Sequence, residues 1–152
     1  MKPDIQIRKF KEITDLDSAI EVYKNLCEFY QRSFNLEESI KFFKVRSYFE
    51  QYHTLCAYDK DKKRVIGLAF SETLTEETQE TTGNIKLIYV EETYRKMGIM
   101  TELVNSMMDY FKEINVDQVR IYLTNDNLPF LNYYSDKLGF KPIITIVERK
   151  SE

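Results

Sequence analysis

The stretch LIYVEETYRKMGIMTELV, residues 87–104, decides the fold because two hydrophobic periodicities meet in it. The compact apolar run that ends at Val90 predicts a strand, whereas Ile99 and Leu103 begin a helical repeat. Between the two lies a polar turn with Gly98, one of four glycines in the chain. We therefore expect a strand, a turn and a helix in succession, which is the start of a βαβ unit.

The same periodicities predict the remaining elements. We expect strands over residues 5–10, 54–58, 65–71, 85–90, 119–123 and 143–147. We expect helices that begin near Thr14, Asn35, Ile99 and Asn127, with Thr14-x-x-Asp17 and Asn35-x-x-Glu38 as capping signals and Gly139 as the end of the last helix. The predicted fold class is α/β with a mixed (α+β) sheet. It has a mostly antiparallel sheet of about six or seven strands, a right-handed βαβ unit and about four flanking helices.

Length and charge bound the class of protein. A chain of 152 residues with 43% hydrophobic side chains predicts a single domain over residues 1–152. A net charge of -3 gives no field that favours nucleic acid. The first residues lack the pattern of a signal peptide and no apolar run is long enough to span a membrane, so we expect a cytoplasmic protein.

Two other features are interpreted as structural. Cys27 and Cys56 lie in apolar stretches and form no cluster with His53, which favours buried thiols and predicts no metal site. The segment 71–84 contains four glutamates and no basic residue, and we expect an exposed, acidic hairpin connection there.

The polar turn has a chemistry of its own. Backbone N–H groups at a helix N-terminus are unpaired and the helix dipole adds positive charge, so such a turn suits a phosphate or pyrophosphate. Gly98 lets the backbone approach the anion, and Arg95 and Lys96 supply charge. A tight turn with a purely structural role is the alternative.

Two motifs together extend this interpretation. LIYVEETYRKMGIMTELV, followed by NLPFLNYYSDKLGFKP at residues 127–142, resembles the GNAT superfamily of acyl-CoA-dependent N-acetyltransferases. The resemblance covers about residues 54–147 and implies acetyl-CoA as co-substrate. It implies that the backbone of Ile88, Tyr89 and Val90 contacts the pantetheine and the acetyl carbonyl. It also implies that Asn127 contacts the cofactor and that a set of turn residues wraps the pyrophosphate: Arg95, Lys96, Met97, Gly98, Ile99, Met100 and Thr101.

Transfer of an acetyl group to an amine requires a proton acceptor, an oxyanion donor and an acid for the departing thiolate. Glu72 is the predicted general base, with Glu91 and Glu92 as alternatives. The resemblance implies a tyrosine as the acid, which is Tyr134 if one residue is inserted before Gly139 and is replaced by Ser135 if none is.

Three functions remain open from the sequence, of which one, a phosphate-binding βαβ protein unrelated to acetyl transfer, has the closing LGFKP motif against it. The first is an N-acetyltransferase whose acceptor is a primary amine of a small molecule, polyamine or peptide, with direct attack in a ternary complex, no metal, and a homodimer as an allowed assembly. The second is a degenerate GNAT domain that senses acyl-CoA or mediates interactions without catalysis. Met100, where the family has Gly or Ala, and Ser135 are the observations that motivate the second.

Overall fold

The computed structural model describes residues 2–144 and 146–151, without the side chains of Asp126 and Asn127. The chain divides into two compact units, Met1–Tyr122 and Leu123–Glu152, and each is described by itself. The first unit contains the whole sheet. The expectation of one domain over residues 1–152 therefore stays a prediction.

The first unit is built on a mixed sheet with the strand order β1-β2-β3-β4-β5. The strands are β1 Ile5–Lys9, β2 Tyr52–Asp59, β3 Arg64–Thr75, β4 Thr81–Val90 and β5 Gln118–Ile121. The first three pairings are antiparallel and the pairing of β4 with β5 is parallel. The predicted β-meander followed by a βαβ unit is confirmed.

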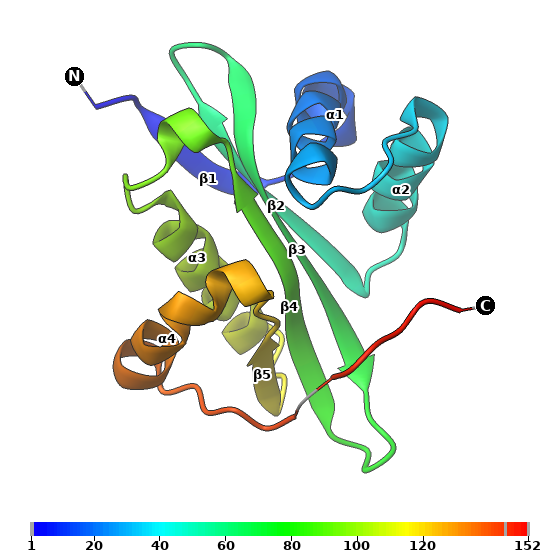
Figure 1. Cartoon of the computed structure of the whole chain (residues 1–152), viewed down its shortest axis with the longest axis vertical. Coiled ribbons are helices and arrows are strands. Elements are labelled where there is room, and N and C mark those ends of the chain that lie inside the picture. Colours follow the sequence, from blue (N-terminus) through cyan, green and yellow to red (C-terminus); the bar gives the residue numbers. More distant parts are fainter. Residues whose placement is uncertain (1, 145, 152) are drawn as a thin grey trace. The chain divides into compact units, whose positions relative to one another are not determined.

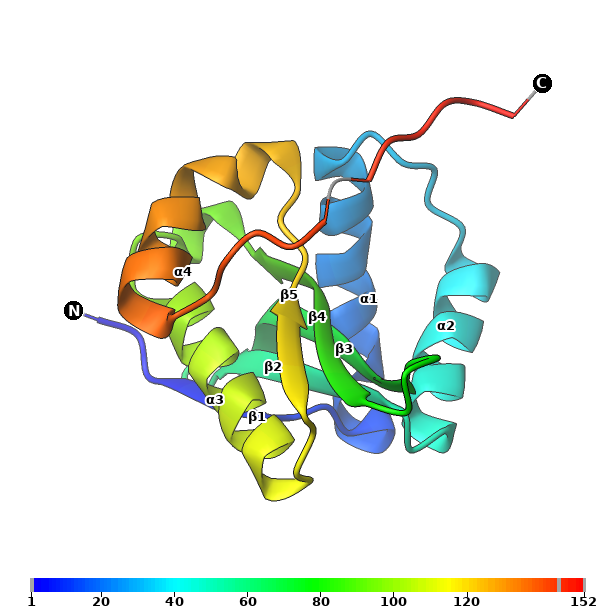
Figure 2. The same cartoon turned by 90° about the horizontal axis from the view of Figure 1, so that it is seen from below.

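Helices cover both faces of this sheet. They are α1 Glu12–Phe29, α2 Leu36–Tyr48 and α3 Ile99–Glu113, with a short 3₁₀ helix, η1, over Glu92–Tyr94. Figures 1 and 2 show α1 and α2 on one face and α3 on the other. Apolar residues of α1 such as Ala19 and Val22 are fully buried, as are Leu103 and Met107 of α3. Burial of one large apolar side chain stabilises the fold by about 1.5–3 kcal/mol.

The two capping predictions had different outcomes. The Asn35 side chain accepts a hydrogen bond from the Glu38 N–H at 2.9 Å, so this cap is confirmed. The predicted cap at Thr14 is wrong, because α1 begins earlier, at Glu12. The buried carboxylate of Asp15 explains the earlier start: it accepts a hydrogen bond from the Lys11 N–H at 2.8 Å and forms an ion pair with Arg8 at 2.6 Å.

The acidic segment 71–84 is more regular than the sequence suggested. β3 continues to Thr75 and β4 begins at Thr81, so only residues 76–80 form the connection. The Glu76 carboxylate accepts hydrogen bonds from Thr82 Oγ1 at 2.9 Å and from Arg120 at 2.8 Å. The expectation of an exposed connection over the whole segment was wrong, because threonines favour strands and Arg120 neutralises the charge of Glu76.

Both cysteines are buried and unbonded to each other, as predicted. Within the described residues, no helix has the length and apolar character that crossing a membrane requires.

Gly83 on β4 tests how tightly α3 packs on the sheet. A Cβ atom at this position would lie 2.5 Å from the Phe111 ring. Gly83→Ala should therefore lower the free energy of unfolding by about 1–3 kcal/mol, because a closely packed core has no room for the added methyl group. Urea denaturation measures the change. The double variant Gly83→Ala/Phe111→Leu should recover part of the loss, and an unchanged urea midpoint for Gly83→Ala alone would contradict the packing.

The second unit contains η2 Asn125–Phe130 and α4 Leu131–Leu138. Gly139 ends α4 with a left-handed φ of 74°, which confirms the predicted helix end. The strand predicted over residues 143–147 is not formed by the four described residues of this range, and Thr145 lies outside the described residues. Ile143 and Ile144 are exposed instead. The described sheet thus has five strands rather than the expected six or seven, because an apolar run becomes a strand only where a partner edge pairs with it.

Candidate active site

The candidate site begins where β4 and β5 part. The parallel pairing joins Thr82–Ile85 to Gln118–Ile121, and the Tyr122 N–H then donates to the Ile85 carbonyl at 2.9 Å. β4 continues five residues further, to Val90, beyond this last pairing. One edge of β4 between Lys86 and Val90 is therefore not covered by β5.

The backbone groups on this edge can be assigned from the pairing with β3. The Glu91 N–H donates to the Ile66 carbonyl at 2.9 Å. Because residues in an antiparallel ladder alternate between facing and turning away from the partner, Ile88 and Val90 direct their N–H and C=O groups away from β3. The backbone groups of Tyr89 are directed toward β3. Of the three strand residues predicted to contact a cofactor, Ile88 and Val90 thus present their backbone at the open edge.

β4 also contains a bulge at the point where the strands part. Leu87 pairs with Phe70, yet Ile85 pairs with Ser71, so Lys86 is an extra residue on β4. Such a bulge turns one side chain out of the regular alternation. No signal in the sequence indicated it.

The turn after β4 ends in a helix N-terminus with free donors. Gly98 has φ of 78°, a conformation that favours glycine, and no heavy atom lies within 4 Å of the position of an added Cβ. The first backbone hydrogen bond of α3 runs from the Glu102 N–H to the Gly98 carbonyl at 3.1 Å. The N–H groups of residues 99–101 therefore have no partner within the helix, and they carry the positive end of the helix dipole.

Buried hydrogen bonds hold this turn to the sheet. The Tyr94 hydroxyl donates to Asp59 Oδ2 at 2.6 Å, and both side chains are buried. At the start of the turn, Glu91 forms an ion pair with Arg64 at 2.9 Å. The turn is thus fixed at its start by a contact to β3 and near its middle by a contact to β2.

The two basic residues of the turn, Arg95 and Lys96, have different surroundings. Arg95 Nε donates to the Val90 carbonyl at 2.9 Å, and its guanidinium lies 5.0 Å from the Phe29 ring centroid. Lys96 is exposed, has φ of 65° and has no ion-pair partner among the described residues. The Lys96 ammonium therefore remains available to an anion, whereas the Arg95 side chain is hydrogen-bonded to the end of β4.

Met100 stands where the resembled motif has Gly or Ala, but neither it nor Met97 fills the space beside Gly98. Met97 and Met100 are both half-buried, and Ile99, between Met100 and Gly98 in sequence, points into the core. The open space lies at Gly98. An anion therefore has access to the helix N-terminus at the glycine.

Tyr94→Phe tests how the turn is held. Burial alone would raise the pKa of Asp59, but hydrogen bonds from Tyr94 and from two backbone N–H groups outweigh it and lower that pKa. Loss of the Tyr94 hydroxyl should decrease the free energy of unfolding at neutral pH by about 1–3 kcal/mol. Since a lowered folded-state pKa stabilises the protein only above the unfolded value, the difference should shrink below about pH 4. Urea denaturation at several pH values measures it.

Tyr58→Phe is the matched control for this variant. Tyr58 lies on the same strand as Asp59, and its hydroxyl makes no hydrogen bond within the described part of the chain. An equal loss of stability in both variants would contradict a specific role for the Tyr94 hydrogen bond.

Polar side chains gather on the sheet beside the bulge. Glu72, the predicted base, lies on β3 with its Oε1 atom 3.6 Å from Lys86 Nζ. Lys86 Nζ lies 3.9 Å from the Tyr122 ring centroid. Lys86 and Tyr122 were not singled out from the sequence, because only the pairing of β4 with β3 and β5 brings them to Glu72. Of the alternative bases, Glu91 is engaged by Arg64 and Glu92 is exposed.

The remaining predicted residues lie in the second unit. The Tyr134 side chain is buried, and its ring lies 5.7 Å from that of Tyr133 and 6.2 Å from that of Phe140. Burial, and less strongly Tyr133, raise the pKa of the Tyr134 hydroxyl. Ser135 is half-buried. The prediction for Asn127 rests on a side chain that lies outside the described residues.

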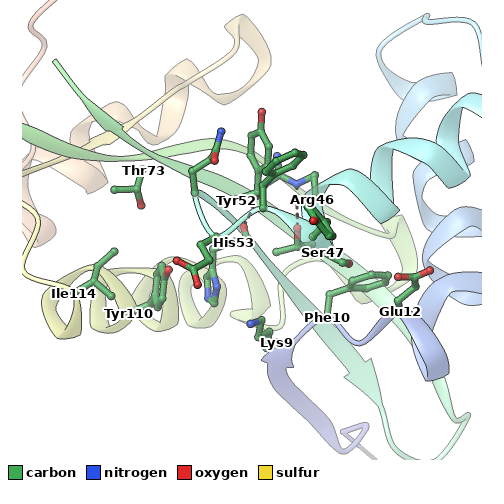
Figure 3. A pocket seen from close by; sticks show the side chains of 15 residues that line it. Lys9, Phe10, Glu12, Arg46, Ser47, Tyr52, His53, Thr73, Tyr110 and Ile114 are labelled. Atoms are coloured by element: carbon green, nitrogen blue, oxygen red, sulfur yellow. Dashed lines mark hydrogen bonds between the residues drawn. The ribbon is translucent and has the colours of Figure 1, made fainter. Parts of the chain in front are cut away.

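A cavity of about 580 Å³ lies at another place in the first unit. Figure 3 shows its lining from the ends of β1 and α2, the start of β2 and the last turns of α3. His53 stacks on Tyr110 with 3.6 Å between ring centroids, and burial, with Lys9 and Arg46, lowers its pKa to about 4. Thr73 of β3 also lines the cavity. It lies six residues along β3 from Gly67, which pairs with Val90, and this separation corresponds to about 20 Å. None of the residues predicted for the site lines this cavity.

Solved structures resemble the fold of this chain. The aminoglycoside N-acetyltransferase AAC(6')-Iy in complex with CoA superposes with a TM-score of 0.79 at 12% identity, covering 99% of this chain and 97% of that one. At this identity the likeness concerns the fold alone. The fold is thus that of a mixed-sheet protein in which one edge of β4 is left open by β5.

Sequence comparison identifies the family. The model of the acetyltransferase (GNAT) family matches residues 20–140. An N-alpha-acetyltransferase of Sulfurisphaera tokodaii is 39% identical over 62 residues, which is 40% of this chain and 36% of that protein. The catalytic subunit NAA10 of the N-terminal acetyltransferase A complex of Arabidopsis thaliana is 28% identical over 88 residues, 57% of this chain and 44% of that protein.

The chain belongs to the acetyltransferase (GNAT) family, whose members use acetyl-CoA. Its matches span less than half the length of these two relatives.

Proposed function

We propose that this protein transfers the acetyl group of acetyl-CoA to a primary amine by direct attack in a ternary complex. The observation that carries the proposal is a path that starts at the open edge of β4, where Ile88 and Val90 direct their N–H groups away from β3, and ends at the unpaired N–H groups of residues 99–101 at the N-terminus of α3. A chain of this family with such a path has the groups that a thioester and a pyrophosphate require.

The cofactor-binding roles follow that path. In this proposal the backbone of Ile88 and Val90 contacts the pantetheine and the acetyl carbonyl, and Tyr89 supports the strand from the core. The turn of residues 95–101 surrounds the pyrophosphate, with the unpaired N–H groups of residues 99–101 as donors, and Lys96 adds a charge. The open space at Gly98 and the unpaired N–H groups fit an anion of this kind. Asn127 is assigned to the cofactor from the family resemblance alone.

Acetyl-CoA supplies an activated acyl group, and the side chains move the protons. Glu72 accepts the proton that the amine must lose before it attacks. The N–H of Val90 or Ile88 donates to the oxygen that becomes negative during the attack. Tyr134 donates a proton to the departing thiolate, and its raised pKa keeps the hydroxyl protonated at neutral pH. No step requires a metal or a nucleophilic residue.

The names of two relatives support a peptide amine as the acceptor. Both are described as acting on N-terminal or N-alpha positions, at 28% and 39% identity. We therefore propose a peptide α-amine as the first acceptor to test, with polyamines and other small amines as alternatives. The same proposal includes a cytoplasmic location and allows a homodimer.

The second candidate function is a non-catalytic domain that senses acyl-CoA. Two observations favour it. Met100 stands where the resembled motif has Gly or Ala, and Ser135 stands at the position of the acid if no residue is inserted before Gly139. A sensor would bind acetyl-CoA with the same backbone groups but release no thiol in the presence of amines.

Thermal-shift titration with acetyl-CoA, CoA and ATP tests binding, since a ligand specific for the folded state raises the unfolding temperature. We expect shifts with both CoA forms and a smaller one with ATP. No shift with either CoA form would refute the proposed function. An assay of thiol release with an N-terminal peptide, spermidine and a small alkylamine then separates enzyme from sensor.

A further inference from the structure

Lys86 occupies a special place beside the proposed site. It is the extra residue of the β4 bulge, and it directly follows Ile85, the last residue of β4 that pairs with β5. The inference below rests on the proposed function, because it needs acetyl-CoA at the open edge of β4.

The contacts of the Lys86 ammonium place it at the start of the gap between the strands. Nζ lies 3.9 Å from the ring centroid of Tyr122, the residue whose N–H makes the final bond to β4. The bulge therefore directs this amine across the point at which the two strands separate. A thioester that enters the gap along β4 approaches the same point.

The distance along β4 is short. Ile88, which presents its backbone at the open edge, is two residues beyond Lys86, or about 7 Å at the rise of a strand. A lysine side chain with four methylene groups covers a comparable length. The Lys86 side chain is 40% exposed, so it has room to move toward the gap.

A proton acceptor is already in place. Glu72 Oε1 lies 3.6 Å from Lys86 Nζ, and the Glu72 side chain is 22% exposed. A half-exposed ion pair of this kind contributes little to stability, about 0–1 kcal/mol, so stability does not account for the arrangement. An amine beside a carboxylate is, however, what aminolysis of a thioester needs.

We propose that Lys86 is itself an acetyl acceptor, modified by acetyl-CoA bound to the same chain. The ammonium gives one proton to Glu72, and the Nζ lone pair attacks the thioester carbonyl. The C–S bond breaks, CoA leaves as a thiolate that takes up a proton, and the second proton lost from nitrogen goes to solvent. The products are Nε-acetyl-lysine at position 86 and CoA. The acetylated side chain has no charge, so its ion pair with Glu72 is lost and the carboxylate becomes available to an external amine.

The test incubates the full chain with acetyl-CoA and no added acceptor, followed by intact-mass spectrometry and peptide mapping. We expect one acetyl group on Lys86, formed at a rate per molecule that does not depend on protein concentration. Lys86→Arg should remove the adduct. Lys41→Arg is the matched control, because Lys41 also lies 3.6 Å from a carboxylate, that of Glu38, on the surface of α2. Glu72→Gln should slow acetylation of Lys86 by about 100-fold.

Calorimetric titration with acetyl-CoA on the same samples separates the two proposals. Binding without acetylation of Lys86 overturns the self-acetylation and leaves the proposed function standing. An absence of binding overturns the proposed function and the self-acetylation with it. Acetylation of Lys86 and Lys41 in proportion to their exposure also overturns the inference. So does a rate per molecule that rises with protein concentration, because neither result requires acetyl-CoA bound to the chain that is modified.

Discussion

Gly98→Asp should lower the affinity for acetyl-CoA by about 100-fold or more. Gly98 is the N-cap residue of α3 and has φ of 78°. The proposed pyrophosphate lies at this end of the helix. A carboxylate about 4 Å from a phosphate charge costs about 4 kcal/mol at the effective dielectric near a protein surface, before screening by salt. Calorimetric titration at low and moderate ionic strength measures the loss, which should be smaller at the higher salt concentration.

Gly98→Asn is the control for size and backbone conformation. Asparagine tolerates a left-handed φ better than most residues and matches aspartate in shape, but it has no charge. It should retain most of the affinity for acetyl-CoA. If asparagine weakens binding as much as aspartate does, no anion binds at this turn, and unchanged affinity in Gly98→Asp would lead to the same conclusion.

Tyr134→Phe should reduce kcat by about 100-fold or more and leave the affinity for acetyl-CoA unchanged. The proposed role of the hydroxyl is to protonate the thiolate, which the ring alone cannot do. Burial raises the pKa of Tyr134, so the parent enzyme should stay active to pH values above about 10 before the acid is deprotonated. The alkaline limb of the kcat profile should be absent in the variant.

Tyr133→Phe and Ser135→Ala complete this experiment. Tyr133 is 37% exposed and precedes Tyr134 on α4, so loss of its hydroxyl should leave kcat within about twofold. A loss of kcat in Ser135→Ala, with full activity in Tyr134→Phe, would transfer the role of the acid to Ser135. That outcome would mean that no residue is inserted before Gly139.

The sequence was most informative where the signal is local. Asn35 caps α2 and Gly139 ends α4 as predicted, because a cap depends on a side chain and on backbone atoms a few residues away. Thr14 failed as a cap because Arg8, on a preceding strand, pairs with Asp15 and sets the start of α1. A contact between two elements overrode a local preference.

The turn after β4 shows the same division. Its glycine, its charges and its position before a helix predicted a site for an anion. The sequence could not separate the roles of Arg95 and Lys96, since both are basic. The structure separates them, because the end of β4 offers Arg95 a carbonyl group and the helix α1 offers it an aromatic ring.

The sequence by itself determined the order of the elements as far as Gly139, the βαβ unit and the glycine turn, because periodicity and turn chemistry are properties of neighbouring residues. Only the tertiary structure decided that β4 and β5 part after Ile85, that Lys86 is an extra residue and that Glu72, Lys86 and Tyr122 meet. These features depend on the register between strands far apart in the chain. A shift of one residue in that register changes which side chains meet, and no pattern within a single strand specifies it.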